Sequence, residues 1–203
     1  MAIFDAFRKN IILSKIAVAF PKELKEDVKK VVSVLFYSIK EVKEDETKWL
    51  MSGGAQVTIP RRIDISHFRY IAYHNLSERQ MAILHCIYSR SFDGFVREGH
   101  IKELLKSGAD KYEWVRPYII SSAGEYVVEI LDTLCNGIAE EKIPKYKAFC
   151  KLNFENIRLL HARMISYWAE FYRKDCYYYK DYIGKRLFSE IFGMRKSGQK
   201  VID

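Results

Sequence analysis

The sequence has few residues that could cross-link the chain or bind a metal. Only four cysteines occur, and no two are spaced as Cys-x-x-Cys, which argues against a structural zinc site and a thioredoxin-type redox motif. The five histidines lack the His-Glu-x-x-His spacing and any comparable ligand pattern. We therefore expect no metal or other cofactor, and we interpret the cysteines as reduced thiols of a cytoplasmic protein. They are Cys86, Cys135, Cys150 and Cys176.

Long apolar runs and phosphate-binding loops are missing as well. The best candidate for a membrane span, residues 28–42, is too short and is interrupted by lysines, so we expect no transmembrane helix and no membrane partner. Residues 1–20 lack the unbroken apolar run and the cleavage site of a secretory signal. The Ser52-Gly53-Gly54 stretch lacks the lysine and hydroxyl residue that complete a phosphate-binding loop. Nucleotide hydrolysis is therefore disfavoured.

Signals that begin and end helices dominate the rest of the chain. Pro21 opens a stretch in which apolar residues recur every three or four positions, Ser77 and Gln80 fit a capping box, and Gly108 suits a helix end. We predict an all-α fold of about seven helices in antiparallel hairpins, either a HEAT-like stack or a helical bundle. The predicted helices cover residues 21–43, 77–90, 95–107, 114–138, with a kink or a start near residue 116, and 154–192, with a break near 174–176.

A chain of 203 residues fits one domain and buries enough surface to need no disulfide framework. We predict a single helical domain over residues 1–203, which could divide into residues 1–65, 66–141 and 142–203.

One stretch, residues 44–65, departs from the helical pattern. We predict an irregular loop with room for a short strand, and we expect residues 44–58 to be the least ordered internal segment because acidic residues crowd beside a glycine pair. Arg61 and Arg62 directly follow Pro60, whose ring stiffens the backbone. These arginines are candidates for binding a phosphate or a carboxylate of a partner, with solvated charge as the alternative.

The middle of the chain carries the pattern of a helical repeat. Asp93, Val96 and Arg97 match Asp-x-x-Val-Arg, and residues 70–140 resemble the HEAT-like segments of uncharacterised bacterial proteins. The resemblance implies that Asp93 caps a helix and that Arg97 pairs with an acid of a neighbouring repeat. We therefore predict a structural pair in which Arg97 is at least half buried and contacts Asp93 or an acid on an adjacent helix, such as Glu129.

Three carboxylates, Glu125, Glu129 and Asp132, are spaced to share one face of a helix. Because apolar residues occupy the opposite face, we interpret this acidic stripe as solvated. Pairing with Arg97, Arg158 or Arg163 of neighbouring helices, a cation site and acid–base chemistry are the alternatives.

The excess positive charge lies at the C-terminal end. Residues 142–203 hold 14 Lys and Arg against 6 Asp and Glu, whereas residues 1–141 hold 20 of each. Basic residues alternate there with aromatic ones, which suits a surface that meets an acidic partner. The candidate partner-binding residues in this region are Lys174, Tyr178, Lys180, Tyr182, Lys185 and Arg186.

These observations favour a non-enzymatic scaffold or adaptor that binds another macromolecule, most readily a protein, because stacked helix hairpins provide an extended surface and we find no catalytic constellation. The first alternative is a nucleic-acid-binding protein that uses the basic, aromatic C-terminal region. The second is an enzyme, a HEAT-like DNA glycosylase in which a carboxylate assists base excision.

Overall fold

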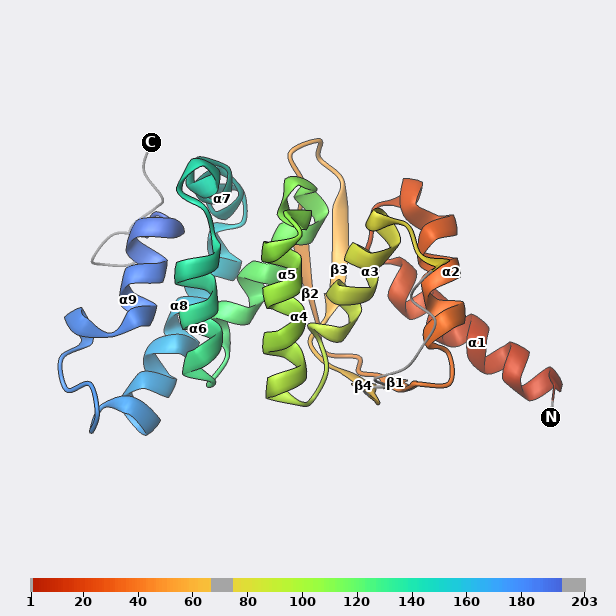
Figure 1. Ribbon diagram of the computed structural model, residues 1–203, viewed down its shortest axis with the longest axis horizontal. Coiled ribbons are helices and arrows are strands. Elements are labelled where there is room, and N and C mark those ends of the chain that lie inside the picture. Colours follow the sequence, from red (N-terminus) through yellow and green to blue (C-terminus); the bar gives the residue numbers. More distant parts are fainter. Residues whose placement is uncertain (1, 67–74, 195–203) are drawn as a thin grey trace.

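The computed structural model describes residues 2–66 and 75–194, and helices make up most of this part of the chain. Figure 1 shows the helices following one another along the long axis of the molecule, from α1 at one end to α9 at the other, with four short strands among them. The prediction of a mainly helical fold is confirmed, and the sheets are the part that it missed. Residues 70–74 of the HEAT-like segment lie outside the described residues.

The first two helices are shorter than the pattern of apolar residues predicts. α1 spans Ala2–Ala17, and a 3-10 turn, Lys22–Leu24, leads into α2, Lys25–Leu35. The helix predicted to reach residue 43 ends at Leu35, because Ile39 and Val42 instead bury their β-branched side chains from strand β1, Ile39–Val42. β1 pairs antiparallel with β4, Ile63–Ile65.

The segment predicted to be an irregular loop forms a second pair of strands. β2, Glu46–Leu50, and β3, Gln56–Pro60, are antiparallel, and Trp49 lies opposite Val57 in their register. The short strand for which the prediction left room is present as β3, but the irregular loop around it was wrong. That part gave the acidic residues and glycines more weight than the buried side chains of Trp49, Val57 and Ile59, which attach the ribbon to the core.

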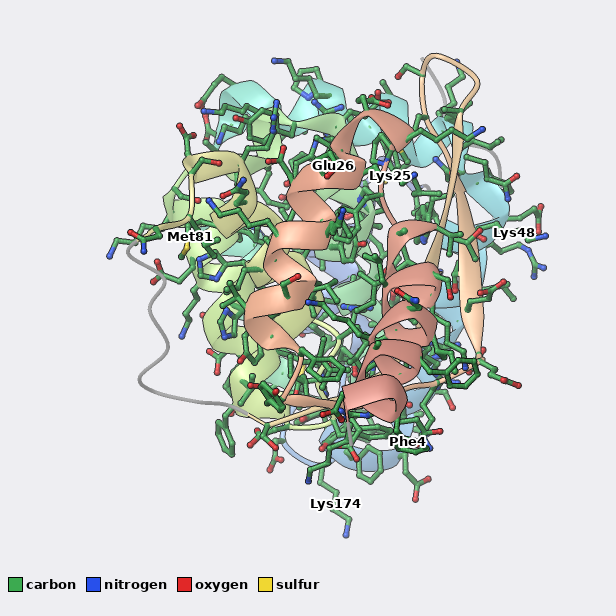
Figure 2. All side chains as sticks on the ribbon, turned by 90° about the vertical axis from the view of Figure 1, so that its right-hand side faces the viewer. Phe4, Lys25, Glu26, Lys48, Met81 and Lys174 are labelled. Atoms are coloured by element: carbon green, nitrogen blue, oxygen red, sulfur yellow. The ribbon has the colours of Figure 1, made fainter. Side chains whose placement is uncertain are left out.

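Two asparagines of the C-terminal helices hold this ribbon in place. The Asn153 side chain accepts a hydrogen bond from Leu50 N at 2.8 Å and donates one to Leu50 O at 3.0 Å. Asn156 Nδ2 donates to Lys48 O at 2.7 Å, and Figure 2 shows Lys48 on the ribbon at the side of the molecule. Asn153 occupies the position before α8, but its side chain makes no capping hydrogen bond.

The central helices follow their local signals closely. α3, Glu78–Tyr88, begins with the predicted capping box of Ser77 and Gln80. α4, Gly94–Lys106, is capped by Asp93, and Gly108 beyond its end takes a left-handed φ of 67°. The two helices form an α3–α4 hairpin.

The predicted helix 114–138 is broken into several pieces. After the 3-10 turns Ala109–Lys111 and Glu113–Val115, α5 spans Arg116–Ser121 with Pro117 in its first turn, so the start predicted near residue 116 is confirmed. A further 3-10 turn, Ser122–Gly124, ends this helix, and α6 begins only at Val128 and runs to Gly137.

The C-terminal region adds three helices. A 3-10 turn, Glu140–Lys142, precedes α7, Ile143–Leu152, and α8 spans Phe154–Tyr167 and continues as a π turn, Trp168–Tyr172. The chain then leaves the helix, as predicted, before the 3-10 turn Tyr179–Asp181. α9, Ile183–Arg186, follows and ends in a second π turn, Leu187–Ile191.

The buried apolar residues form one cluster that extends from Ile12 to Met194. Apart from this single cluster, nothing in the structure tests the prediction of one domain over residues 1–203. Among the described residues, no helix combines the length and apolar character needed to cross a membrane.

Close packing around α9 makes a testable prediction. A Cβ atom at Gly184 would lie 2.5 Å from Met164 Sδ and 2.9 Å from Tyr182 Cε1, both in the core. We expect Gly184→Ala to lower the free energy of unfolding by about 1–3 kcal/mol, since it overpacks the core. Gly53→Ala is the control, because no atom lies within 4 Å of the added Cβ. Equal urea midpoints for the two variants would contradict this packing.

Candidate functional site: an arginine cluster around Glu125

Arg97 lies in α4 with only 1% of its surface exposed. Its Nη1 donates hydrogen bonds to Ser91 O at 2.9 Å and to Phe92 O at 2.8 Å, and its Nη2 donates to Glu125 Oε2 at 3.2 Å. The predicted burial and acid pairing are therefore confirmed. The partner is neither Asp93 nor Glu129, because Asp93 accepts hydrogen bonds from Phe95 N and Val96 N as the cap of α4.

Glu125 is the acid at the centre of this arrangement. It follows the 3-10 turn Ser122–Gly124 in extended conformation and is 6% exposed. Besides Arg97, it accepts a hydrogen bond from Arg62 Nη2 at 2.6 Å. Burial alone would raise the pKa of Glu125, but Arg62 and Arg97 outweigh that effect and hold its pKa below the ordinary value.

The predicted acidic stripe is therefore only partly correct. Glu125 does not belong to it, because the chain leaves the helix at Gly124 and turns this carboxylate inward. Glu129 and Asp132 do lie on α6 and are exposed, which confirms the solvated interpretation for those two.

The described residues contain no group of three or more His, Cys, Asp or Glu that could hold a metal ion.

A third arginine, Arg90, is buried beside the pair. It follows α3, and its guanidinium donates to Ser89 O at 2.8 Å, to Ser122 Oγ at 3.0 Å and to Tyr118 O at 3.4 Å. Burial lowers the pKa of Arg90 to about 10, although the nearby Glu125 carboxylate opposes the shift. Three arginines therefore gather around one carboxylate, and their positive charge is only partly compensated.

The cluster opens into a small pocket with a volume of about 80 Å³. Arg61, Arg62 and Arg90 line it together with Arg163, which comes from α8. Arg61 forms an exposed ion pair with Asp45 at 3.0 Å. The structure thus brings the predicted pair Arg61 and Arg62 to a pocket, and it adds Arg90, Glu125 and Arg163, which sequence reasoning missed as site residues.

The tyrosines predicted to bind a partner divide into exposed and buried ones. Tyr177 and Tyr178 are 65% and 61% exposed, with Arg173 Cζ 5.8 Å from the centre of the first ring and Lys180 Nζ 5.2 Å from the second. Tyr182 is only 4% exposed and packs on Tyr172, so it is not available to a partner. Its predicted place in the binding surface was wrong, because α9 turns this ring into the core.

Arg173 and Lys180 lie over the exposed tyrosine rings, but the other predicted basic residues make no such contact among the described residues. Lys185 is half-buried, and Arg186 forms an ion pair with Glu190 at 3.5 Å. Lys174 is exposed, and Figure 2 shows it extending away from the ribbon. In residues 170–181, however, three cations and three carboxylates balance.

The uncompensated positive charge of this region lies elsewhere. α7 and α8 hold about half of it, as five lysines and arginines stand against the single acid, Glu155, between residues 143 and 167. In Figure 1, α7 lies on the opposite side of the molecule from the chain that follows the π turn Trp168–Tyr172. The charge excess and the exposed tyrosines therefore do not form the continuous surface expected from the sequence.

The three buried cysteines are poorly suited to nucleophilic chemistry. Burial raises the pKa of the Cys135 thiol to about 11 and shifts the pKa values of Cys86 and Cys150 upward as well. Because the thiolate is the reactive form, these thiols stay protonated and unreactive at neutral pH.

Comparisons with known proteins add no relative: no family model, no curated protein and no solved structure matches this chain. The HEAT-like resemblance of residues 70–140 therefore stays a prediction, which the Asp93 cap and the buried Arg97 fit locally.

The buried ion pair makes a second testable prediction. Arg97→Met leaves Glu125 with one direct partner fewer and buries part of its charge uncompensated, which should lower the free energy of unfolding by about 3–5 kcal/mol. The control is Arg158→Met on α8, since Arg158 pairs with Glu155 at the surface and should contribute less than about 1 kcal/mol. A similar urea midpoint for both variants would show that the buried pair is not structural.

The lowered pKa of Glu125 makes a pH-dependent prediction. Since its folded-state pKa lies below the ordinary value of 4.5, its stabilising effect is complete above that pH and is lost as the pH falls toward the folded-state value. The difference in unfolding free energy between the wild type and Glu125→Gln should therefore be largest near neutral pH and shrink under acid. Urea unfolding between about pH 7 and pH 3 measures it, and a constant difference would refute the assignment.

Proposed function

We propose that this protein is a non-enzymatic adaptor that binds another protein and takes an anionic group of that partner into the arginine pocket. One observation carries the proposal: four arginines and two carboxylates line the pocket, which leaves a formal excess of two positive charges in a partly buried place. Because low-dielectric surroundings strengthen the attraction of an anion, such an excess favours recognition of a negative group.

The state of each charged group supports this interpretation. Glu125 and Asp45 are already engaged by Arg62 and Arg61. Arg163, in contrast, makes no ion pair or hydrogen bond with any residue that the structure describes, although its side chain is only half exposed. Arg163 is therefore the cation most available to an incoming group.

The surroundings of the pocket favour a macromolecular ligand. The pocket, at about 80 Å³, is far smaller than the cavities of roughly 300–1,000 Å³ that enclose whole small molecules. Beside it lies an open depression of about 450 Å³ that shares Arg61, Arg62 and Asp45 with the pocket. Lys43, Glu44 and the exposed ring of Phe92 also line it. An extended chain segment could place one anionic group in the pocket and its neighbours in the depression.

The nucleic-acid alternative receives less support. It rests on a basic surface continuous with stacked aromatic rings, whereas the charge excess on α7 and the exposed Tyr177 and Tyr178 lie apart. For the glycosylase hypothesis, the buried acid Glu125 is already held by Arg62 and Arg97. Neither alternative therefore accounts for the arginine pocket as directly as an adaptor does.

Reversing the available cation tests the proposed function. We expect Arg163→Glu to reduce recovery of partners by affinity capture from a native, nuclease-treated lysate by at least about tenfold, since it replaces an attraction with a repulsion. Arg158→Glu, one turn away on α8, is the control and should capture partners as the wild type does. Equal capture by both variants would refute the pocket as a recognition site. Loss of all capture on nuclease treatment would favour the nucleic-acid alternative.

A further inference from the structure

The arginine pocket contains a polar group that the protein itself leaves unsatisfied. Trp49 lines the pocket and is buried, and its indole Nε1–H has no hydrogen-bond acceptor among the described residues. A buried donor without an acceptor costs free energy, so native proteins rarely keep one without a reason. The N–H itself has almost no solvent-exposed surface, so a ligand oxygen in the pocket would provide the missing acceptor only after the side chains around the indole shift on binding.

Two arginines that line the same pocket lack a carboxylate partner. Arg90 is buried with its pKa lowered, and no carboxylate lies within ion-pair distance of it among the described residues. Arg163 is unpaired in the same part of the chain. The donors around the pocket therefore come from four separate segments: β2 provides Trp49, the turn after β3 provides Arg62, the end of α3 provides Arg90 and α8 provides Arg163.

From the charge, the size and the donors together, we infer that the pocket binds the phosphate group of a phosphorylated side chain in a partner protein. This inference rests on the proposed adaptor function and names the group that the adaptor recognises. A phosphomonoester carries about 1.5 to 2 negative charges at neutral pH, which matches the formal excess of two positive charges.

The alternative anion, a carboxylate, fits the pocket less well. A carboxylate has one negative charge and two oxygens, which a single arginine can satisfy in a bidentate contact. A phosphate group offers three terminal oxygens that diverge in a tetrahedron, so it can accept from several converging donors at once. A set of three guanidinium groups and an indole N–H therefore suits a phosphate group better than a carboxylate.

Phosphate binding should change the electrostatic surroundings of the arginines. The phosphate would give the buried Arg90 a counter-charge that opposes the lowering of its pKa by burial, and it would leave the pairing of Glu125 with Arg62 and Arg97 unchanged. Binding should therefore stabilise the folded protein, because the ligand binds the folded state and not the unfolded one.

Titration with simple anions at constant ionic strength tests the ligand class. We expect inorganic phosphate at millimolar concentration to raise the thermal unfolding midpoint by about 2 °C or more, with acetate at the same concentration producing no change. Arg163→Gln should weaken phosphate binding by about tenfold, and Trp49→Phe, which keeps an aromatic ring but removes the N–H, should weaken it by several-fold. Arg158→Gln is the matched control and should bind phosphate as the wild type does.

Peptides distinguish a phosphorylated side chain from free phosphate. An acidic-flanked phosphoserine peptide should bind at least about tenfold more tightly than inorganic phosphate, since its backbone can contact the depression beside the pocket. Its unphosphorylated form should not bind measurably. If inorganic phosphate binds and the phosphopeptide does not, the site takes free phosphate and our inference is wrong.

The adaptor function and the phosphate inference can fail separately. If acetate stabilises the protein as strongly as phosphate does, or if phosphatase treatment of the lysate leaves Arg163-dependent capture unchanged, the recognised group is a carboxylate. The phosphate inference then fails while the adaptor function stands. If Arg163→Glu leaves capture unchanged and no anion binds, both proposals fail.

Discussion

The buried carboxylate of Glu125 joins parts of the chain that are distant in sequence. It accepts hydrogen bonds from Arg62, which follows the β2–β3 ribbon, and from Arg97 in the α3–α4 hairpin, and it faces the charge of Arg90. A buried arginine without a counter-charge is costly, so each segment reaches its native place only when the others are there. The ribbon, the hairpin and the start of α6 therefore depend on one another.

The same interaction leaves positive charge uncompensated at the centre of the molecule. One carboxylate cannot neutralise Arg62, Arg90 and Arg97 together, and Arg163 adds a further cation at the pocket. A chain optimised only for stability would replace the surplus charge with apolar side chains of similar volume, which is often neutral or stabilising. The surplus therefore does not serve folding, and it is the feature on which the proposed binding function rests.

The sequence predicts those features that depend on neighbouring residues. The capping box at Ser77, the Asp93 cap and the left-handed Gly108 each arise from contacts within a few positions, and all are present. The burial of Arg97 was also predicted, but through a family resemblance. Its partner, Glu125, was given only as an alternative, because the predicted helix was extended through Gly124, where the chain turns Glu125 inward. Ser122 and Gly124 were the local sign of this break.

The remaining site residues carry no such local sign. Arg90 and Arg163 each look like solitary arginines at the end or on the face of a helix, and only the packing of α3 against the later helices brings them to one pocket. Trp49 was expected in a loop, since the residues before it are acidic and those after it include two glycines. Only tertiary structure places these residues in the site, and patterns of neighbouring residues in the sequence do not predict it.

The asparagines that hold the ribbon have a consequence for solubility. A two-stranded sheet has two open edges, and such edges can pair with strands of other molecules. Asn153 contacts the backbone of Leu50 through both its amide oxygen and its amide nitrogen, as a neighbouring strand would, while Thr58 N on the other strand donates to Val18 O at 2.8 Å. Each edge therefore makes backbone hydrogen bonds within the molecule, and Asn153 occupies a position on the β2 edge where a strand of another molecule would otherwise pair.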